Sequence, residues 1–250
     1  MLEKRIYGLL VFGANHEFLE RIASDIHSIF GENLILEKID ELLADLTELG
    51  LVVTFRASYK LRRFRDDLAK LSKDSKITKD QVKQLREIMG EIWPTLQAEA
   101  SGKMAYIVSE RRFPIEHLMA NPSNLFAVGA FSKLPEMAKR DFSEATKCLS
   151  FERSTAAAFH MLRATESVLR HYYCQKMHRS RAQLMWGPIC ESMKKYPRRF
   201  PVPLLNHLDH IRSSFRNPTA HPEKIYDIDE AQDLLSICID VANRMSLDLK

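Results

Sequence analysis

The sequence predicts an all-α protein in which an N-terminal helical region precedes a helical bundle. Apolar residues recur at helical spacing along most of the 250 residues. Only 8 glycines occur, which suits a helical protein better than a turn-rich β fold. A hydrophobic content of 45% allows a sizeable core. We expect a helical region over residues 1–100, a connecting segment over 101–132 and the bundle over 133–250.

The N-terminal region is expected to consist of helices separated by short breaks. After a break at Gly31, a helix over residues 35–49 has one apolar face and one acidic face. The next segment, residues 52–71, is strongly basic, and we expect it to pair with the acidic face or to leave that face to a regulatory partner. A further helix opens at a capping box, Thr78 to Gln81. Pro94 is expected to kink or end that helix.

Four helices are predicted in the C-terminal bundle. Their apolar series run over residues 134–149, 158–172, 204–215 and 231–245. Between the second and third series lies a basic, proline-rich stretch, residues 176–203. In the connecting segment, residues 104–108 are apolar enough for a short strand or one buried turn of helix.

The run from Arg216 to His221, Arg-Asn-Pro-Thr-Ala-His, is the strongest functional signal. An arginine can bind a phosphate, and a histidine can transfer a proton at neutral pH. Pro218 has no N–H and disfavours helical geometry at Asn217, so we expect the third helix of the bundle to stop here. The turn would bring His221 back toward Arg216. Together these residues indicate metal-free chemistry on a phosphodiester.

The same run resembles the Arg-x4–6-His signature of the HEPN superfamily (higher eukaryote and prokaryote nucleotide-binding domains). Residues 151–169 are similar to the alanine-rich second helix of that family, and residues 221–234 to its closing turn and last helix. The resemblance covers roughly residues 134–247. It implies a helical bundle that dimerises through an isologous interface, and ribonuclease activity in the active members.

The resemblance implies roles for individual residues in RNA cleavage by the 2′-hydroxyl. His221 would act as general base or general acid, Arg216 would stabilise the transition state, and Asn217 would orient the phosphate or the imidazole. Two protomers would supply the two histidines that such a reaction needs. Glu166, on the second helix, would orient His221 or pair with Arg212 or Arg216. Its plainer alternative is an ion pair with Arg170, four residues on.

Basic residues near this run are candidates for contact with the RNA backbone. The alternative for such residues is a solvated helix face. The expected substrate-binding set is Arg212, Lys194, Lys195, Arg198 and Arg199.

Other function classes lack support in the sequence. The four cysteines show no zinc spacing, and there is no glycine-rich phosphate loop, so neither a metal nor a cofactor is expected. No signal peptide or membrane-spanning run is apparent, which favours a cytoplasmic protein. The net charge of +4 is compatible with nucleic acid. The expected partners are RNA, a second copy of the chain, and an antitoxin or regulatory protein.

Three functions therefore remain open. The first is a metal-independent endoribonuclease of the toxin or phage-defence kind. The second is a non-catalytic HEPN-like module that binds nucleotide or RNA, or serves only in dimerisation. The third is a structural adaptor in which Arg216 and His221 stabilise a dimer.

Overall fold

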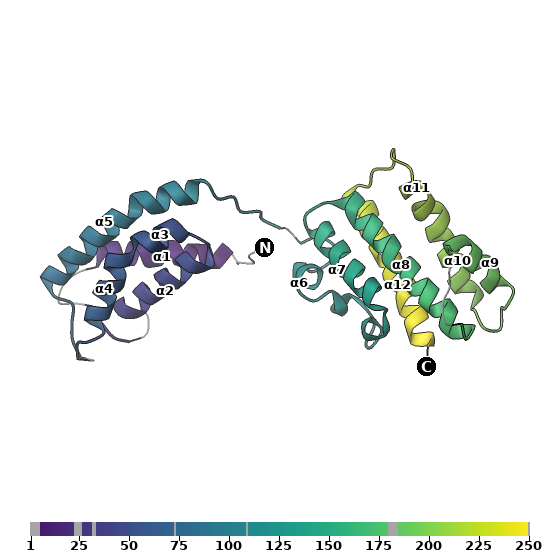
Figure 1. Ribbon diagram of the computed structural model, residues 1–250, viewed down its shortest axis with the longest axis horizontal. Helices are drawn as coiled ribbons and strands as arrows, with labels where there is room; N and C mark the ends of the chain where they lie inside the picture. Colours follow the sequence, from purple (N-terminus) through teal and green to yellow (C-terminus); the bar gives the residue numbers. More distant parts are fainter. Residues whose placement is uncertain are drawn as a thin grey trace. The chain divides into compact units, whose positions relative to one another are not determined.

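The computed structural model describes residues 6–22, 27–31, 34–72, 74–108, 110–179 and 185–249 (Figure 1). Within these ranges the secondary structure is helical and no strand occurs, which confirms the all-α prediction. The chain divides into two units, Met1–Tyr106 and Ile107–Lys250. Residues 107–132, expected as part of a connection, thus belong to the second unit. None of the helices in the described ranges is long and apolar enough to cross a lipid bilayer.

The first unit is a set of helices around one apolar core. The core is formed by residues at helical spacing, among them Leu19, Ile39 and Leu85, each fully buried. The predicted capping box is confirmed, because Thr78 accepts from Gln81 N–H while the Gln81 side chain accepts from Thr78 N–H. The helices are α1 (Ile6–Arg21), α2 (Ile35–Glu48), α3 (Val52–Ala57), α4 (Tyr59–Leu68) and α5 (Lys79–Ser101).

Two expectations for the first unit need refinement. The segment 52–71 is two helices, separated at Ser58, whose hydroxyl donates to the Thr54 carbonyl at 2.7 Å. Pro94 lies inside α5, which continues to Ser101, so the alternative that it ends the helix is wrong. The expected pairing of the acidic and basic segments occurs within the chain. The Arg65 guanidinium donates two hydrogen bonds, of 2.8 and 2.9 Å, to the carboxylate of Asp40.

The second unit contains a helix at each of the four predicted positions, and also short helices at Ile115–Met119 and Trp186–Lys194 that were not predicted. Helix α8 packs against α7 on one side and α12 on the other, and α12 also packs against α10. Residues 104–107 form neither a strand nor a helix. The elements are α6 (Ile115–Met119), the 3-10 turns η1 (Pro122–Leu125) and η2 (Phe131–Lys133), α7 (Glu136–Ser150), α8 (Ser154–Lys176), α9 (Trp186–Lys194), α10 (Val202–Ile211), the π-helical turn η3 (Arg212–Arg216), α11 (Asn217–Thr219) and α12 (Ile228–Asp248).

Helix α9 lies inside the stretch that we described only as basic and proline-rich. Trp186, Ile189, Cys190 and Met193 are spaced at helical intervals and are all buried, with at most 1% of their surface exposed. These four apolar residues pack α9 against α8 and α10. The lysines and arginines around them hid this short amphipathic pattern.

The helix that carries Arg216 does not stop at Pro218, contrary to our prediction. Asn217 has helical angles, φ −67° and ψ −48°, and the helical path runs on to Thr219. The π-helical turn explains this outcome. The N–H of Asn217 donates to the carbonyl of Arg212, five residues back, and this wider turn gives the proline ring room that a regular α-helix lacks. The Thr219 hydroxyl then bonds to the Phe215 carbonyl at 2.6 Å.

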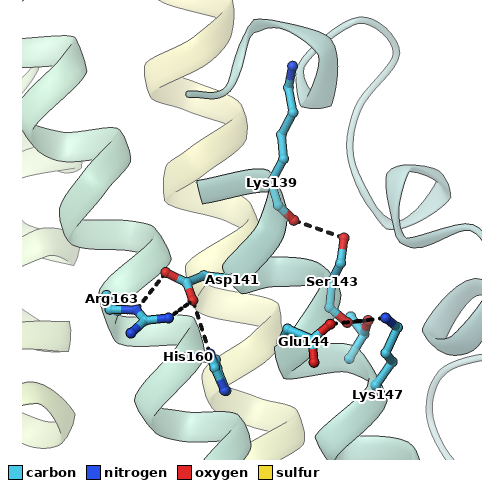
Figure 2. Close-up of polar contacts among 8 residues, drawn as sticks. Lys139, Asp141, Ser143, Glu144, Lys147, His160 and Arg163 are labelled. Carbon is cyan, nitrogen blue, oxygen red and sulfur yellow. Dashed lines mark hydrogen bonds and ion pairs between the residues drawn. The ribbon is translucent and has the colours of Figure 1, made fainter. Parts of the chain in front are cut away.

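A buried carboxylate joins α7 to α8. Figure 2 shows Asp141 of α7 facing His160 and Arg163 of α8. Nε and Nη2 of Arg163 both donate to this carboxylate, and His160 Nδ1 lies 3.0 Å from its Oδ1. Burial alone would raise the pKa of Asp141, which is 2% exposed, but the hydrogen bonds from Arg163 and His160 outweigh it and lower that pKa.

Replacing Asp141 by asparagine is expected to destabilise the second unit by about 1.5–3 kcal/mol at pH 7, since hydrogen bonds to a charged group contribute this much. The pKa of this carboxyl is lower in the folded state, so its contribution exists above the unfolded pKa of about 3.9 and is lost as the pH falls through the folded pKa. The difference between wild type and variant should therefore shrink below about pH 4. Urea unfolding measures it.

The two tryptophans of the chain make this measurement specific. Trp93 lies in the first unit and Trp186 in the second, so in a Trp93→Phe background the fluorescence reports on the second unit. Asp240→Asn is the matched control, because that carboxylate is 41% exposed and its pairs contribute at most about 1 kcal/mol. Equal losses in Asp141→Asn and Asp240→Asn would contradict the expectation.

Candidate functional site

Glu166 of α8 holds Arg216 of η3 beside a second arginine. Glu166 Oε2 lies 3.8 Å from Arg216 Nη2, and Oε1 accepts from Arg170 Nη2 at 2.6 Å. Of the partners considered for Glu166, the structure thus gives it two at once, Arg170 four residues on and Arg216. The Glu166 side chain is 17% exposed and Arg216 is 30% exposed, so the pair opens to solvent mainly through the arginine.

Arg212, at the start of the same π-helical turn, faces a second acidic residue. Its Nη2 lies 3.4 Å from Oδ1 of Asp209. Asp209 Oδ2 in turn lies 2.7 Å from Nζ of Lys194, which also donates to Glu191 at 2.8 Å. The bonds to Asp209 and then to Glu191 raise the pKa of Lys194. Lys194 is thus engaged by two carboxylates and presents little free charge to a ligand.

Several buried polar atoms around these pairs have no hydrogen-bond partner among the described residues. They are Trp186 Nε1, Arg170 Nε, Arg212 Nε and Asp209 Oδ1. The 3.4 Å ion pair of Asp209 Oδ1 with Arg212 lacks hydrogen-bond geometry. Buried polar atoms normally find partners, and each one left without a partner costs about 1–3 kcal/mol. This concentration distinguishes the surroundings of η3 from an ordinary helix contact.

Gly187 allows Arg212 to approach the start of α9. A Cβ atom at position 187 would lie 2.9 Å from Nη1 of Arg212, closer than side chains normally come. The atom it would meet is the end of a flexible side chain, so the backbone need not move. Glycine at this position therefore lets the Arg212 guanidinium lie against α9.

Replacing Gly187 by alanine is expected to leave stability nearly unchanged. Alanine favours a helix over glycine by about 1 kcal/mol, but the new methyl group must displace Arg212, and the two effects oppose each other. In an Arg212→Ala background the displacement vanishes, so Gly187→Ala should there stabilise by about 1 kcal/mol. Thermal unfolding of the four proteins of this double-mutant cycle measures the coupling. The same effect in both backgrounds would contradict it.

His221 lies just beyond the end of α11. Its N–H donates to the Pro218 carbonyl at 2.9 Å, and its side chain is exposed. Within the described ranges no hydrogen bond or ion pair joins the imidazole to Arg216 or to Glu166. Asn217 is likewise exposed, with its carbonyl accepting from Ala220 N–H. The structure thus places His221 and Asn217 near Arg216 in sequence and leaves both side chains open.

The loop after His221 is anchored to the start of α8. Tyr226 N–H donates to the Thr155 hydroxyl at 3.1 Å, and the Tyr226 hydroxyl lies 2.6 Å from that of Thr219. Burial raises the pKa of Tyr226, so the phenol remains a neutral hydrogen-bonding group. These bonds fix both ends of the segment that carries His221.

The predicted substrate-binding residues separate into two places. Arg212 and Lys194 meet at Asp209, in the neighbourhood of η3. Arg198 and Arg199 instead line a hollow at the start of α10. Lys195 is exposed and lines neither place. In the sequence Lys194, Lys195, Arg198 and Arg199 lie in one basic stretch, because helix α9, which ends at Lys194, was not recognised within it.

The described residues offer no obvious alternative chemistry. They contain no group of three or more His, Cys, Asp and Glu side chains placed to hold a metal ion. Burial raises the pKa of Cys190 to about 12 and that of Cys238 to about 12, which makes both thiols poor nucleophiles at neutral pH.

Comparisons with protein-family models, with curated proteins and with solved structures give no match to this chain. The resemblance to the HEPN superfamily thus rests on the sequence motifs alone.

Sequence reasoning missed Gly187 and Asp141. No sequence signal marked Gly187. Asp141 did have one, because it falls between Ala138 and Phe142 on the apolar stripe of α7, where a carboxylate needs a partner.

Proposed function

We propose that the second unit is a metal-independent endoribonuclease of the HEPN type. The observation that carries this proposal is the π-helical turn, which presents Arg212 and Arg216 at 32% and 30% exposure. It is followed by an exposed histidine, His221, whose side chain makes no hydrogen bond or ion pair with the residues that the structure describes. π-Helical turns are rare and are frequent at functional sites. Arginine suits a phosphate because its planar fork donates two parallel hydrogen bonds.

The proposed reaction is attack of the RNA 2′-hydroxyl on the adjacent phosphorus. His221 Nε2 or Nδ1 takes the proton of the 2′-hydroxyl as the oxygen–phosphorus bond forms. The bond from phosphorus to the 5′-oxygen breaks, and that oxygen receives a proton. The products are a 2′,3′-cyclic phosphate and a 5′-hydroxyl. Arg216 neutralises the charge that accumulates on the phosphate oxygens, and Asn217, exposed beside it, donates to one of them.

Glu166 regulates how freely Arg216 meets the phosphate in this proposal. Its contact with Arg216 is long, at 3.8 Å, whereas its bond to Arg170 is short, at 2.6 Å. A substrate phosphate can therefore replace Glu166 at Arg216 while Arg170 keeps the carboxylate neutralised. Glu166 acts here as a positioning residue.

A second copy of the chain completes the proposed site. One histidine cannot easily serve as base on one side of a phosphate and as acid on the other, so two copies of His221 would share these roles across an isologous interface. Exposed apolar residues near the histidine support such an interface. Ile225 is 78% exposed and adjoins Tyr226, which bonds to the start of α8, and Phe159 of α8 is 54% exposed.

The balance of charge favours one alternative, a non-catalytic module for RNA or nucleotide binding or for dimerisation. The cations around η3 are almost matched by carboxylates, which leaves a weak positive field. The cations are Arg170, Arg212, Arg216 and Lys194, and the carboxylates are Glu166, Asp209 and Glu191.

A toxin or phage-defence role would add a restraining antitoxin, whose removal or neutralisation frees the site.

Incubation of the purified protein with total cellular RNA and tRNA in EDTA tests the proposal. The expected result is cleavage whose products end in 2′,3′-cyclic phosphate and begin with 5′-hydroxyl. Sedimentation of the same sample measures the oligomeric state, and a dimer is expected. Cleavage that needs a divalent cation, or that leaves 3′-hydroxyl ends, would refute the mechanism. Binding of RNA by a dimer without cleavage would favour the module.

A further inference from the structure

A basic hollow lies at the start of α10, whereas the π-helical turn follows the other end of that helix. It has a volume of about 600 Å³ and forms where α8 and α12 end and α10 begins. Figure 1 shows the last turn of α12 and the last turn of α8 at the same end of this unit. We call it the Arg198 pocket; the lining residues used below are Lys176, His178, Arg198, Arg199, Pro201 and Asp248.

The Arg198 pocket carries an excess of positive charge. Lys176 Nζ lies 2.8 Å from Oδ2 of Asp248, and the same oxygen accepts from the hydroxyl of the buried Tyr172 at 2.5 Å. The carboxylate is thus satisfied within the protein. Three cationic side chains against one carboxylate leave the lining with a formal charge of +2 when His178 is neutral.

Two of these cations have a structural role that explains their presence. Arg199 Nη1 donates to the Lys176 carbonyl at 3.3 Å, at the C-terminal end of α8, where the helix dipole favours a cation. Lys176 joins α8 to the end of α12 through Asp248. Neither role applies to Arg198 or to His178, whose side chains make no hydrogen bond or ion pair with the described residues.

The start of α10 adds to the positive potential of the pocket. Pro201, which lines the pocket, precedes Val202, the first residue of α10, and no side chain caps this end. The first N–H groups of a helix are unpaired and bear the positive end of its dipole. Pro203, the second residue of α10, has no N–H, so the helix start contributes mainly through its dipole. An anion in the pocket would therefore meet the Arg198 and His178 side chains beside the positive end of α10.

We infer that the Arg198 pocket binds a phosphate group of an RNA strand, away from the scissile bond. The choice of RNA as the ligand rests on the proposed ribonuclease function. The site itself rests on the cavity and on the charges that line it. The helical path from Pro201 to Arg216 measures about 22 Å, at about 1.5 Å per residue. One strand of a few nucleotides spans this distance. The same chemistry would accept a terminal phosphate of RNA or a free phosphate.

Binding of a 2′-O-methylated single-stranded RNA of about ten nucleotides tests the inference, because this RNA cannot be cleaved. Arg198→Ala should weaken binding about tenfold at low salt and should reduce the salt slope by about 1, as expected for one lost phosphate contact. Lys195→Ala is the matched control, since Lys195 is exposed nearby and does not line the pocket. Arg198→Lys should retain part of the affinity.

Further arms identify the source of the phosphate. If a 5′-phosphate on the RNA strengthens binding, or inorganic phosphate inhibits it, only when Arg198 is present, the pocket takes a terminal phosphate. If neither changes the affinity and Arg198→Ala still weakens binding, the pocket takes an internal phosphodiester. Equal affinities of wild type, Arg198→Ala and Lys195→Ala, or absence of RNA and phosphate binding by the wild type, would overturn the inference. Because binding is read without cleavage, this result is independent of the test of the ribonuclease.

Discussion

Replacing His221 by alanine is expected to reduce metal-independent RNA cleavage by about 100- to 10,000-fold, the usual contribution of a proton-transfer group. The exposed imidazole makes no hydrogen bond or ion pair with other described side chains, so its loss should leave the fold intact. Initial rates on a labelled RNA in EDTA, with thermal unfolding of both proteins, measure the two effects separately.

His210→Ala is the matched control for His221→Ala. His210 lies on the same helical segment and is exposed, but its contacts are the Ser214 hydroxyl and the Phe215 ring. Its loss should change the rate by less than threefold, an amount worth about 0.6 kcal/mol. Equal activity of His221→Ala and wild type would remove His221 from the reaction. Equal losses in both variants would point to a role in folding.

Variants of Arg216 and of its partner Glu166 test the same site independently of His221. Arg216→Lys keeps the charge but loses the planar fork, so a bidentate contact with the phosphate predicts a large loss in that variant too. Glu166→Gln should instead increase the affinity for RNA, because it removes the negative charge 3.8 Å from Arg216. An increase in RNA affinity with Glu166→Gln would support competition between substrate and Glu166.

Replacing Trp186 by alanine is expected to lower the free energy of unfolding of the second unit by about 3–5 kcal/mol. Trp186 is 1% exposed and is the largest fully buried side chain of the described residues. It joins α9 to the core of the second unit, so its loss opens a cavity between this helix and that core. Thermal unfolding followed by circular dichroism measures the change.

Trp186→Phe separates volume from polarity at the same position. It keeps most of the apolar volume and removes an indole N–H that has no partner among the described residues. Removing an unpaired buried donor recovers about 1–3 kcal/mol, which offsets the lost contacts. We therefore expect the phenylalanine variant to lose less than about 1.5 kcal/mol. A loss as large as that of the alanine variant would contradict this account of the N–H.

The fold class followed from local patterns that survive in the structure. The series at residues 134–149 and 158–172 correspond to α7 and α8, and the series at residues 231–245 lies within α12, whose start is capped by the Asp227 side chain accepting from Glu230 N–H. These features depend on helical spacing and on neighbouring residues, which a sequence displays directly.

What the sequence did not reveal depends on contacts between distant residues. Pro218 was expected to stop a helix because the rule considers only the regular α-helical turn, and the π-helical turn before it is not visible in the letters. Helix α9 was hidden because a glycine and a proline lie among its four buried positions and lysines and arginines follow it. The division of the basic residues between the Arg198 pocket and Asp209 required knowing where α10 begins.

The π-helical turn also sets the direction in which Arg216 points. A π turn accommodates one residue more than the α-helix around it, so the residues after it lie one helical step, about 100°, from where an unbroken α-helix would place them. If the segment closed as a regular α-helix with all its residues, Arg216 would turn away from Glu166, and Pro218 would meet the carbonyl of Ser214. Deleting Ser213 would instead remove the extra residue and keep Arg216 on the side of Glu166. The extra residue thus aims the arginine, whatever residues surround it.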